Sequence, residues 1–371
     1  MNIKTKMLAM KKWLSLLLVV LSLQLKAQNT KISDSISFYG MIRVQLGLFD
    51  NKIQLQENSP RIGIYLNRKI DDQWSVNGKI EMGLHFIDGV NFNNDANSSI
   101  EFVSNPFSKA EVLSPRLAYV AIQQKKWGVL SIGKQWGVYY DIGAYTDNFS
   151  LFGGAAHGIY AGGTDGGWKG TGRADNSIQY RNRWGDLQTG IQTQLFGDTE
   201  SFGISVQYDI NKNLTIGTTY NTVKIQPKIQ EFIKGIGKNS SNFLAGMKYS
   251  SSKYYGAATF SVNDDAIAKK DSATVISAPT NGYELSLGYI PNSKWAFEGG
   301  LNIIDSKEAT ILNNNNYRLM HFILGANYFI TPATRVYLLS RYSHSDYAQQ
   351  KDDYNVLVLG FRYNIDFGKK F

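Results

Sequence analysis

Residues 173–209 read RADNSIQYRNRWGDLQTGIQTQLFGDTESFGISVQYD, and polar and apolar side chains alternate along this stretch. From Arg173 to Arg181 the odd positions are mostly polar, while Ile178 and Tyr180 lie on the even side. Because successive side chains point to opposite faces of a strand, the run predicts a strand with one polar and one mostly apolar wall. The runs that follow the turn near Gly185 repeat the pattern.

The same period predicts sixteen strands along the chain. They cover residues 36–49, 60–70, 74–86, 115–124, 127–136, 173–183, 186–196, 200–210, 213–223, 242–250, 253–262, 281–290, 294–304, 317–330, 333–343 and 354–371. An even number of strands is typical of a bacterial barrel made from a single chain. We therefore expect an all-β fold, a 16-stranded antiparallel transmembrane β-barrel.

The connections between these strands fall into two classes. Short turn-forming connections lie at residues 71–73, 211–212, 291–293 and 331–333. Long connections lie at residues 87–114, 137–172, 223–241 and 263–280. Short turns on one rim and long loops on the other match the inner and outer rims of an outer-membrane barrel.

The N-terminus reads as a leader. Lys11 and Lys12 precede the apolar run 13–25, and Ala27 supplies a small residue for cleavage. This layout predicts a signal peptide at residues 1–27 and a mature chain at 28–371. Five of the 39 basic residues lie in the leader, which has no acid, so the mature chain keeps 34 basic and 30 acidic residues, a net charge of +4. Such a small excess gives no reason to expect nucleic acid as a partner.

Composition limits the chemistry further. The chain has 371 residues and no cysteine, so neither a disulfide framework nor a thiolate metal site is available, and we expect no cofactor. A soluble all-β protein would also show alternating strands, because alternation does not say which face is wet. The leader, the number of strands of similar length and aromatic residues near strand ends, such as Trp74, Trp127 and Trp295, favour a membrane barrel.

Seven short stretches stand out along the chain. They are Phe38-Tyr39-Gly40, Ser59-Pro60-Arg61-Ile62-Gly63, Arg116-Leu117-Ala118-Tyr119-Val120, Gly133-Lys134-Gln135-Trp136-Gly137-Val138-Tyr139-Tyr140-Asp141, Tyr145-Thr146-Asp147, Phe152-Gly153-Gly154 and Tyr180-Arg181-Asn182. In this order and spacing they resemble the general diffusion porins of Gram-negative bacteria. The C-terminus is similar too: apolar side chains of one parity end on Phe371, although Lys369 interrupts the series.

The resemblance implies a trimeric porin of the outer membrane that passes small hydrophilic solutes and ions. Its surroundings would be the lipid bilayer and lipopolysaccharide, and the loop at 87–114 is the candidate for gripping a neighbouring subunit. The third long loop of such porins folds inward and narrows the pore, and here that loop would be 137–172. A flexible surface loop is the alternative. A phosphate-binding loop is excluded, because residues 167–170 lack the Gly-Lys-Ser/Thr ending.

In such porins, basic residues on the wall face acids on the inserted loop. Motif position places Arg61, Arg116 and Arg181 on the basic wall, and Arg43 joins them by neighbourhood, since Met41 stands at the matching position. Alternation independently places Arg61 and Arg181 on a polar face. Arg116 shares its parity with apolar residues, so its assignment rests on the motif.

The acidic side is depleted. Asp147 matches the acid of the family's loop, and Glu81 lies on the polar face of its strand. Where the family typically has a carboxylate, this chain has Leu151. Because basic rings favour anions and acidic rings favour cations, these six residues predict an anion-preferring constriction. The alternative is that the arginines pair with neighbours and merely stiffen the wall.

Three other functions stay open. A barrel enzyme needs an oriented nucleophile or metal site, but none of the four histidines (His85, His157, His321 and His344) falls in a recognisable catalytic or metal spacing. A solute-specific channel for an anion or sugar would use the same arginines for binding. A structural or adhesive barrel without conductance is permitted by the long loops.

Overall fold

A computed structural model describes residues 33–49, 52–87, 112–160, 165–195, 197, 200–271, 274–306, 318–345 and 355–370. The predicted signal peptide, most of the predicted loop 87–114 and Phe371 lie outside the described residues.

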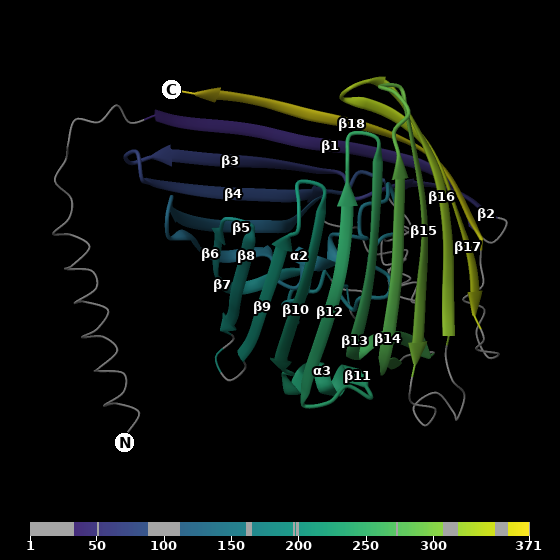
Figure 1. Ribbon diagram of the computed structural model, residues 1–371. Helices are drawn as coiled ribbons and strands as arrows, with labels where there is room; N and C mark the ends of the chain where they lie inside the picture. The colour runs from purple at the N-terminus through teal and green to yellow at the C-terminus, as the bar shows by residue number, and fades with distance from the viewer. Residues whose placement is uncertain are drawn as a thin grey trace.

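Sixteen strands of the described chain form one closed antiparallel sheet (Figure 1). They are β1 (Ser33–Phe49), β3 (Arg61–Lys69), β4 (Trp74–Leu84), β5 (Leu113–Gln124), β6 (Gly128–Trp136), β7 (Arg173–Trp184), β8 (Leu187–Leu195), β9 (Glu200–Asp209), β10 (Leu214–Lys224), β12 (Asn239–Ser250), β13 (Tyr254–Asp271), β14 (Thr274–Tyr289), β15 (Trp295–Ser306), β16 (Arg318–Thr331), β17 (Thr334–Ser345) and β18 (Val356–Lys370). The predicted 16-stranded barrel is confirmed.

The barrel closes where its first and last strands meet. Each strand pairs with the next, and β18 pairs with β1 from Ser35 opposite Lys370 to Phe49 opposite Val356. The two strands lie side by side in Figure 1. Closure pairs the backbone groups of both would-be edges, which is what a hydrocarbon environment requires of a sheet.

Four shorter elements accompany the sixteen strands in the described part of the chain. β2 (Lys52–Glu57) pairs with the end of β1, and β11 (Ile233–Lys234) lies parallel to β14. The helices α2 (Tyr140–Gly143) and α3 (Pro227–Phe232) lie in predicted loops. Among the described residues, no helix is both long and apolar enough to cross a membrane.

One predicted connection is wrong. Residues 263–280 were expected as a long loop, but the ladder between β13 and β14 continues past a register shift near Asn263 until Asp271 opposes Thr274. The sequence signal was present in residues 274–276, which read TVI, since β-branched residues favour strands.

The two faces of the barrel differ as the alternation predicts. Large apolar side chains of one parity are exposed on the outer face, for example Phe38, Ile42, Ile62, Ile64, Leu357 and Leu359. The other parity is largely polar and shielded, for example Gln45, Asn77, Gln179, Gln192 and Asn221. An apolar outside around a polar inside is the pattern of a barrel in lipid.

Side chains close the short turns at one rim. At three of them a single oxygen accepts hydrogen bonds from the backbone N–H groups two and three residues further on: Asp71, Asn211 and Asn292. These Asp and Asn side chains therefore hold the chain in a tight reversal, as the turn residues predicted.

Candidate functional site

Three arginines stand in one row across the seam of the barrel. Arg335 of β17 is the direct partner of Arg362 of β18, and Arg362 is the direct partner of Arg43 of β1. All three have the parity of the polar inner wall, with Arg43 buried. Like charges directly opposite each other destabilise a sheet, so the row opposes folding and points to a role for the charge itself.

Glu81 joins two further arginines on the neighbouring strands. Its Oε1 accepts a hydrogen bond from Arg116 Nε at 2.8 Å and lies 3.8 Å from Arg61 Nη1. Its Oε2 accepts a hydrogen bond from the Tyr39 hydroxyl at 2.9 Å. The structure therefore brings together three of the residues that the sequence singled out.

A β-bulge explains the parity of Arg116. In the ladder between β4 and β5, Glu81 pairs with Leu117 while the next residue, Met82, pairs with Pro115, so Arg116 is left without a direct partner. An extra residue of this kind re-aims a side chain. Arg116 therefore reaches the inner carboxylate of Glu81 although alternation alone would turn it outward.

Arg43 contacts the segment 137–172 directly. Its Nη1 donates to the backbone oxygen of Ser150 at 3.1 Å, and Asn58 Nδ2 donates to the same oxygen at 3.1 Å. The sequence selected Arg43 by its neighbourhood, and the structure places its side chain against this segment.

Arg181 lies apart from the arginine row. On β7 it forms an ion pair with Asp141, and its Nη2 donates to the Trp136 carbonyl at 3.1 Å. It therefore fastens the start of the segment 137–172 to the wall, and its charge is balanced by a carboxylate.

Asp147 is held by hydroxyl groups. Its Oδ2 accepts hydrogen bonds from Tyr140 and Tyr160, both at 2.9 Å. Burial raises the pKa of the Asp147 carboxyl above its ordinary value, although these hydroxyls and Arg173 oppose the shift. Among the described residues no basic side chain forms an ion pair with Asp147, so its predicted partnership with the wall arginines is not direct.

The segment 137–172 packs against the polar wall at several points. Glu284 of β14 accepts hydrogen bonds from Thr146 Oγ1 and the Ala156 backbone N–H, both at 2.6 Å. Lys169 and Asp265 form a buried ion pair. Next to these contacts, position 282 must be glycine, because a Cβ there would collide with the Ala156 carbonyl oxygen.

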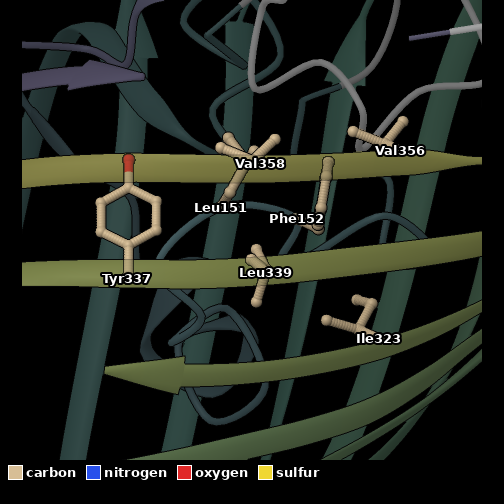
Figure 2. Packing of buried hydrophobic residues seen from close by; sticks show 7 residues of the cluster. All are labelled: Leu151, Phe152, Ile323, Tyr337, Leu339, Val356 and Val358. Atoms are coloured by element: carbon tan, nitrogen blue, oxygen red, sulfur yellow. The ribbon is translucent and has the colours of Figure 1, made fainter. Parts of the chain in front are cut away.

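An apolar cluster holds the middle of the segment. Leu151 and Phe152 are each 1% exposed, and Figure 2 shows them beside side chains of β16, β17 and β18. The cluster comprises Leu151, Phe152, Ile323, Tyr337, Leu339, Val356 and Val358. Leu151, which stands where the porins that the sequence resembles typically have a carboxylate, therefore contributes packing in place of charge.

A hydroxyl, an imidazole and a carboxylate meet near the end of β4. His85 Nδ1 lies 2.7 Å from Glu57 Oε1, and His85 Nε2 lies 2.9 Å from Ser114 Oγ. The other Glu57 oxygen, Oε2, accepts hydrogen bonds from the backbone N–H groups of Phe86 and Ile87. The network ties β2 to the residues after β4, and the spacing of histidines did not reveal it.

Sequence reasoning missed Arg335 and Arg362. The resemblance is strongest from residue 37 to 196, and its C-terminal part concerns only the apolar parity that ends on Phe371, so it assigned no basic residue on these strands. Alternation could have found Arg362, because it has the opposite parity to the outward-facing Phe361 and Tyr363.

Comparison with known proteins agrees with this geometry. The family model described as Gram-negative porin matches residues 15–368. The chain belongs to this family. Outer membrane porin F of Xenorhabdus nematophila is 26% identical over 288 residues, which cover 70% of this chain and 72% of that protein. Outer membrane porin protein OmpD of Citrobacter koseri is 26% identical over 285 residues, which cover 67% of this chain and 73% of that protein.

Solved porin structures share the fold. OmpF of Salmonella typhi, in complex with daunomycin, superposes with a TM-score of 0.71 at 17% identity, covering 89% of this chain and 97% of that one. An anion-selective porin from Comamonas acidovorans gives a TM-score of 0.65 at 14% identity, covering 90% and 100%. The trimer form of OmpT from Vibrio cholerae gives 0.64 at 16% identity, covering 90% and 99%. This porin is an outer-membrane diffusion channel.

Proposed function

We propose that the segment 137–172 folds into the barrel and narrows a water-filled pore that passes small hydrophilic solutes and prefers anions. The observation that carries the proposal is the arginine row Arg335–Arg362–Arg43, continued by Arg61 and Arg116 on the adjoining strands. A cluster of basic side chains at a narrow point lowers the energy of an anion there and raises that of a cation.

The acids of the segment do little to balance this row. Asp141 is paired with Arg181, and Asp165 lies 2.7 Å from Lys134 Nζ and 3.3 Å from Arg173 Nε. Asp147 has its pKa raised by burial. Among the described residues of the segment, Asp147 is thus the one acid without an ion-pair partner, so the segment adds at most one free negative charge opposite the five arginines.

The reversal potential of the purified porin in a planar bilayer, measured across a KCl gradient, tests the preference. We expect the sign that marks chloride as the more permeant ion. The double variant Arg335→Gln, Arg362→Gln should reduce the chloride preference, because both charges belong to the row. Lys212→Gln, on an exposed turn, is the matched control and should leave the preference unchanged. A cation preference in the unaltered porin would overturn the proposal.

We propose that the porin is a homotrimer embedded among phospholipid and lipopolysaccharide. The apolar outer face of the barrel supports a lipid-facing position, and a fold shared with the trimer form of OmpT supports the oligomeric state. Chemical cross-linking in native outer membranes should trap species up to three chains. Cross-linking that stopped at one chain would contradict the trimer.

We propose that the porin has no catalytic activity and that Glu57, His85 and Ser114 form a structural strut. Glu57 accepts hydrogen bonds from two backbone N–H groups that follow β4. These bonds support the structural role, because they fix the end of β4 against β2. Incubation with a fluorophosphonate probe and with labelled phospholipid should give neither labelling nor hydrolysis. Labelling that Ser114→Ala abolished would instead reveal an activated serine.

A further inference from the structure

Two tyrosine rings and one ammonium group form a second row on the inner wall. On β4 this row lies one inward-facing residue beyond Glu81, toward the short turns. In register across β3, β4 and β5, Tyr65 is the direct partner of Lys79, and Lys79 is the direct partner of Tyr119. The three side chains share the parity of Glu81 on the inner wall and are half-buried. We call Tyr65, Lys79 and Tyr119 the aromatic shelf.

Small residues flank the aromatic shelf on both sides. The same ladder continues to Ser37 of β1 beyond Tyr65 and to Gly133 of β6 beyond Tyr119. Neighbouring strands lie roughly 4.8 Å apart, so the two tyrosine Cα atoms stand about 10 Å apart with the Lys79 stem between them. Along this row the two tyrosines are therefore flanked only by a serine and a glycine, while the Tyr39 ring lies over Gly63, on the side of the arginines.

The charge of Lys79 is available at the shelf. Its Nζ lies 4.8 Å from the centre of the Tyr39 ring, above which it makes a cation–π contact. Among the described residues no carboxylate lies within ion-pair distance of Lys79; the nearby Glu81 is engaged by Arg61 and Arg116. An anion that has passed the arginines therefore meets an ammonium group beside two rings.

We propose that the aromatic shelf is a binding site for aromatic carboxylates in transit through the pore. Ring faces attract the edges and faces of another aromatic ring, while the ammonium attracts its carboxylate. A small aliphatic acid would use only the ammonium, and an aromatic cation would be repelled by Lys79 and the arginines above it. The site rests on the proposed anion-preferring pore and adds to it a preference among anions.

Block of chloride current in a planar bilayer tests the shelf. Sodium benzoate and sodium acetate are added separately to the purified porin in KCl, and the half-blocking concentration of each is measured. We expect benzoate to block at a lower concentration than acetate. The double variant Tyr65→Leu, Tyr119→Leu should weaken block by benzoate about two- to tenfold and leave acetate unchanged, because only the ring contacts are lost. Lys79→Met should weaken block by both acids.

A lipid-facing ring supplies the control. Tyr208→Leu removes a tyrosine that is 48% exposed on the outer face and should leave both half-blocking concentrations unchanged. Migration of each variant as a folded barrel in an unheated gel excludes misfolding. Equal block by benzoate and acetate in an anion-selective porin would overturn the shelf while leaving the proposed function intact. Competition by glucose as strong as by benzoate would also overturn it, whereas a cation-preferring reversal potential would overturn the proposed function.

Discussion

We expect Glu81 to set how much of the arginine charge acts on a passing ion. Its carboxylate touches Arg116 and lies near Arg61, so it cancels part of their field. Glu81→Gln removes one negative charge and keeps the side-chain length. We expect the chloride-to-potassium permeability ratio to rise about two- to fivefold, since a unit charge several ångströms from the ion path contributes on the order of 1 kcal/mol in a wet pore. Reversal potentials measure the ratio.

The control for Glu81 is another glutamate outside the lumen. Glu200 is exposed at the start of β9, on the outward parity, and Glu200→Gln should leave the permeability ratio unchanged. A fall in chloride preference in Glu81→Gln would show that Glu81 instead orients the arginines toward the ions.

We expect Asp147 to make the ion selectivity depend on pH. Burial raises the pKa of its carboxyl, so the folded porin protonates Asp147 at a higher pH than an unfolded chain would. Lowering the pH through this raised pKa removes a negative charge, and the chloride preference should therefore increase. By linkage, neutral Asp147 favours the folded state, and this contribution is lost as the pH rises through the folded pKa. Reversal potentials measured between pH 7 and pH 4 should show the increase, and Asp147→Asn should show less of it.

At the level of the elements, we expect docking of the segment 137–172 to depend on its apolar contact with β16, β17 and β18. Phe152→Ala deletes a ring that is 1% exposed between β16, β17 and β18, and should weaken docking of the segment by about 3–5 kcal/mol. Amide hydrogen exchange of residues 137–160 should accelerate, and current noise should rise. Leu324→Ala, which removes a side chain that is 52% exposed to lipid, should change neither.

The buried ion pair between Lys169 and Asp265 fastens the later part of the same segment. Lys169→Met leaves the Asp265 carboxylate buried, with the Ser240 hydroxyl as its remaining donor among the described residues, and should cost about 3–5 kcal/mol. The double variant Lys169→Met, Asp265→Leu removes both charges and should recover most of the loss. Gel-shift melting of the barrel and hydrogen exchange near residue 169 compare the two. An equal loss in both variants would assign the effect to packing.

The strands could be predicted because alternation is a local signal in the sequence. Irregularities in strand pairing could not be predicted, because they depend on how two strands align. Alternation between lipid and water located β7 and β8 to within a residue or two. The bulge at Arg116 depends on how β4 and β5 align, and this pairing is not written in either strand alone. The same is true of Arg335, whose meaning appears only when Arg362 lies opposite it.

At the scale of the whole molecule, the net charge of the chain does not predict the proposed ion selectivity. The predicted mature chain has a net charge of only +4, which gives no reason to expect a strong anion preference. The proposed preference rests instead on closure of the barrel, which places Arg335, Arg362 and Arg43 side by side, while much of the acidic charge is exposed, such as Asp72, or already paired, such as Asp141. Counting charges in the sequence could not foresee that arrangement.

A selectivity that depends on this one cluster must weaken as salt screens it. The Debye length is about 10 Å at 0.1 M salt and about 3 Å at 1 M. At low salt the field of the row therefore spans the narrow part of the pore, and at high salt it fades within one side-chain length. We expect the chloride preference to be larger for a gradient of 0.03 to about 0.3 M KCl than for the same ratio at 0.3 to about 3 M. A ratio that stayed constant over this range would mean that ions bind the arginines in direct contact, and saturation of the conductance at high salt would then be the accompanying sign.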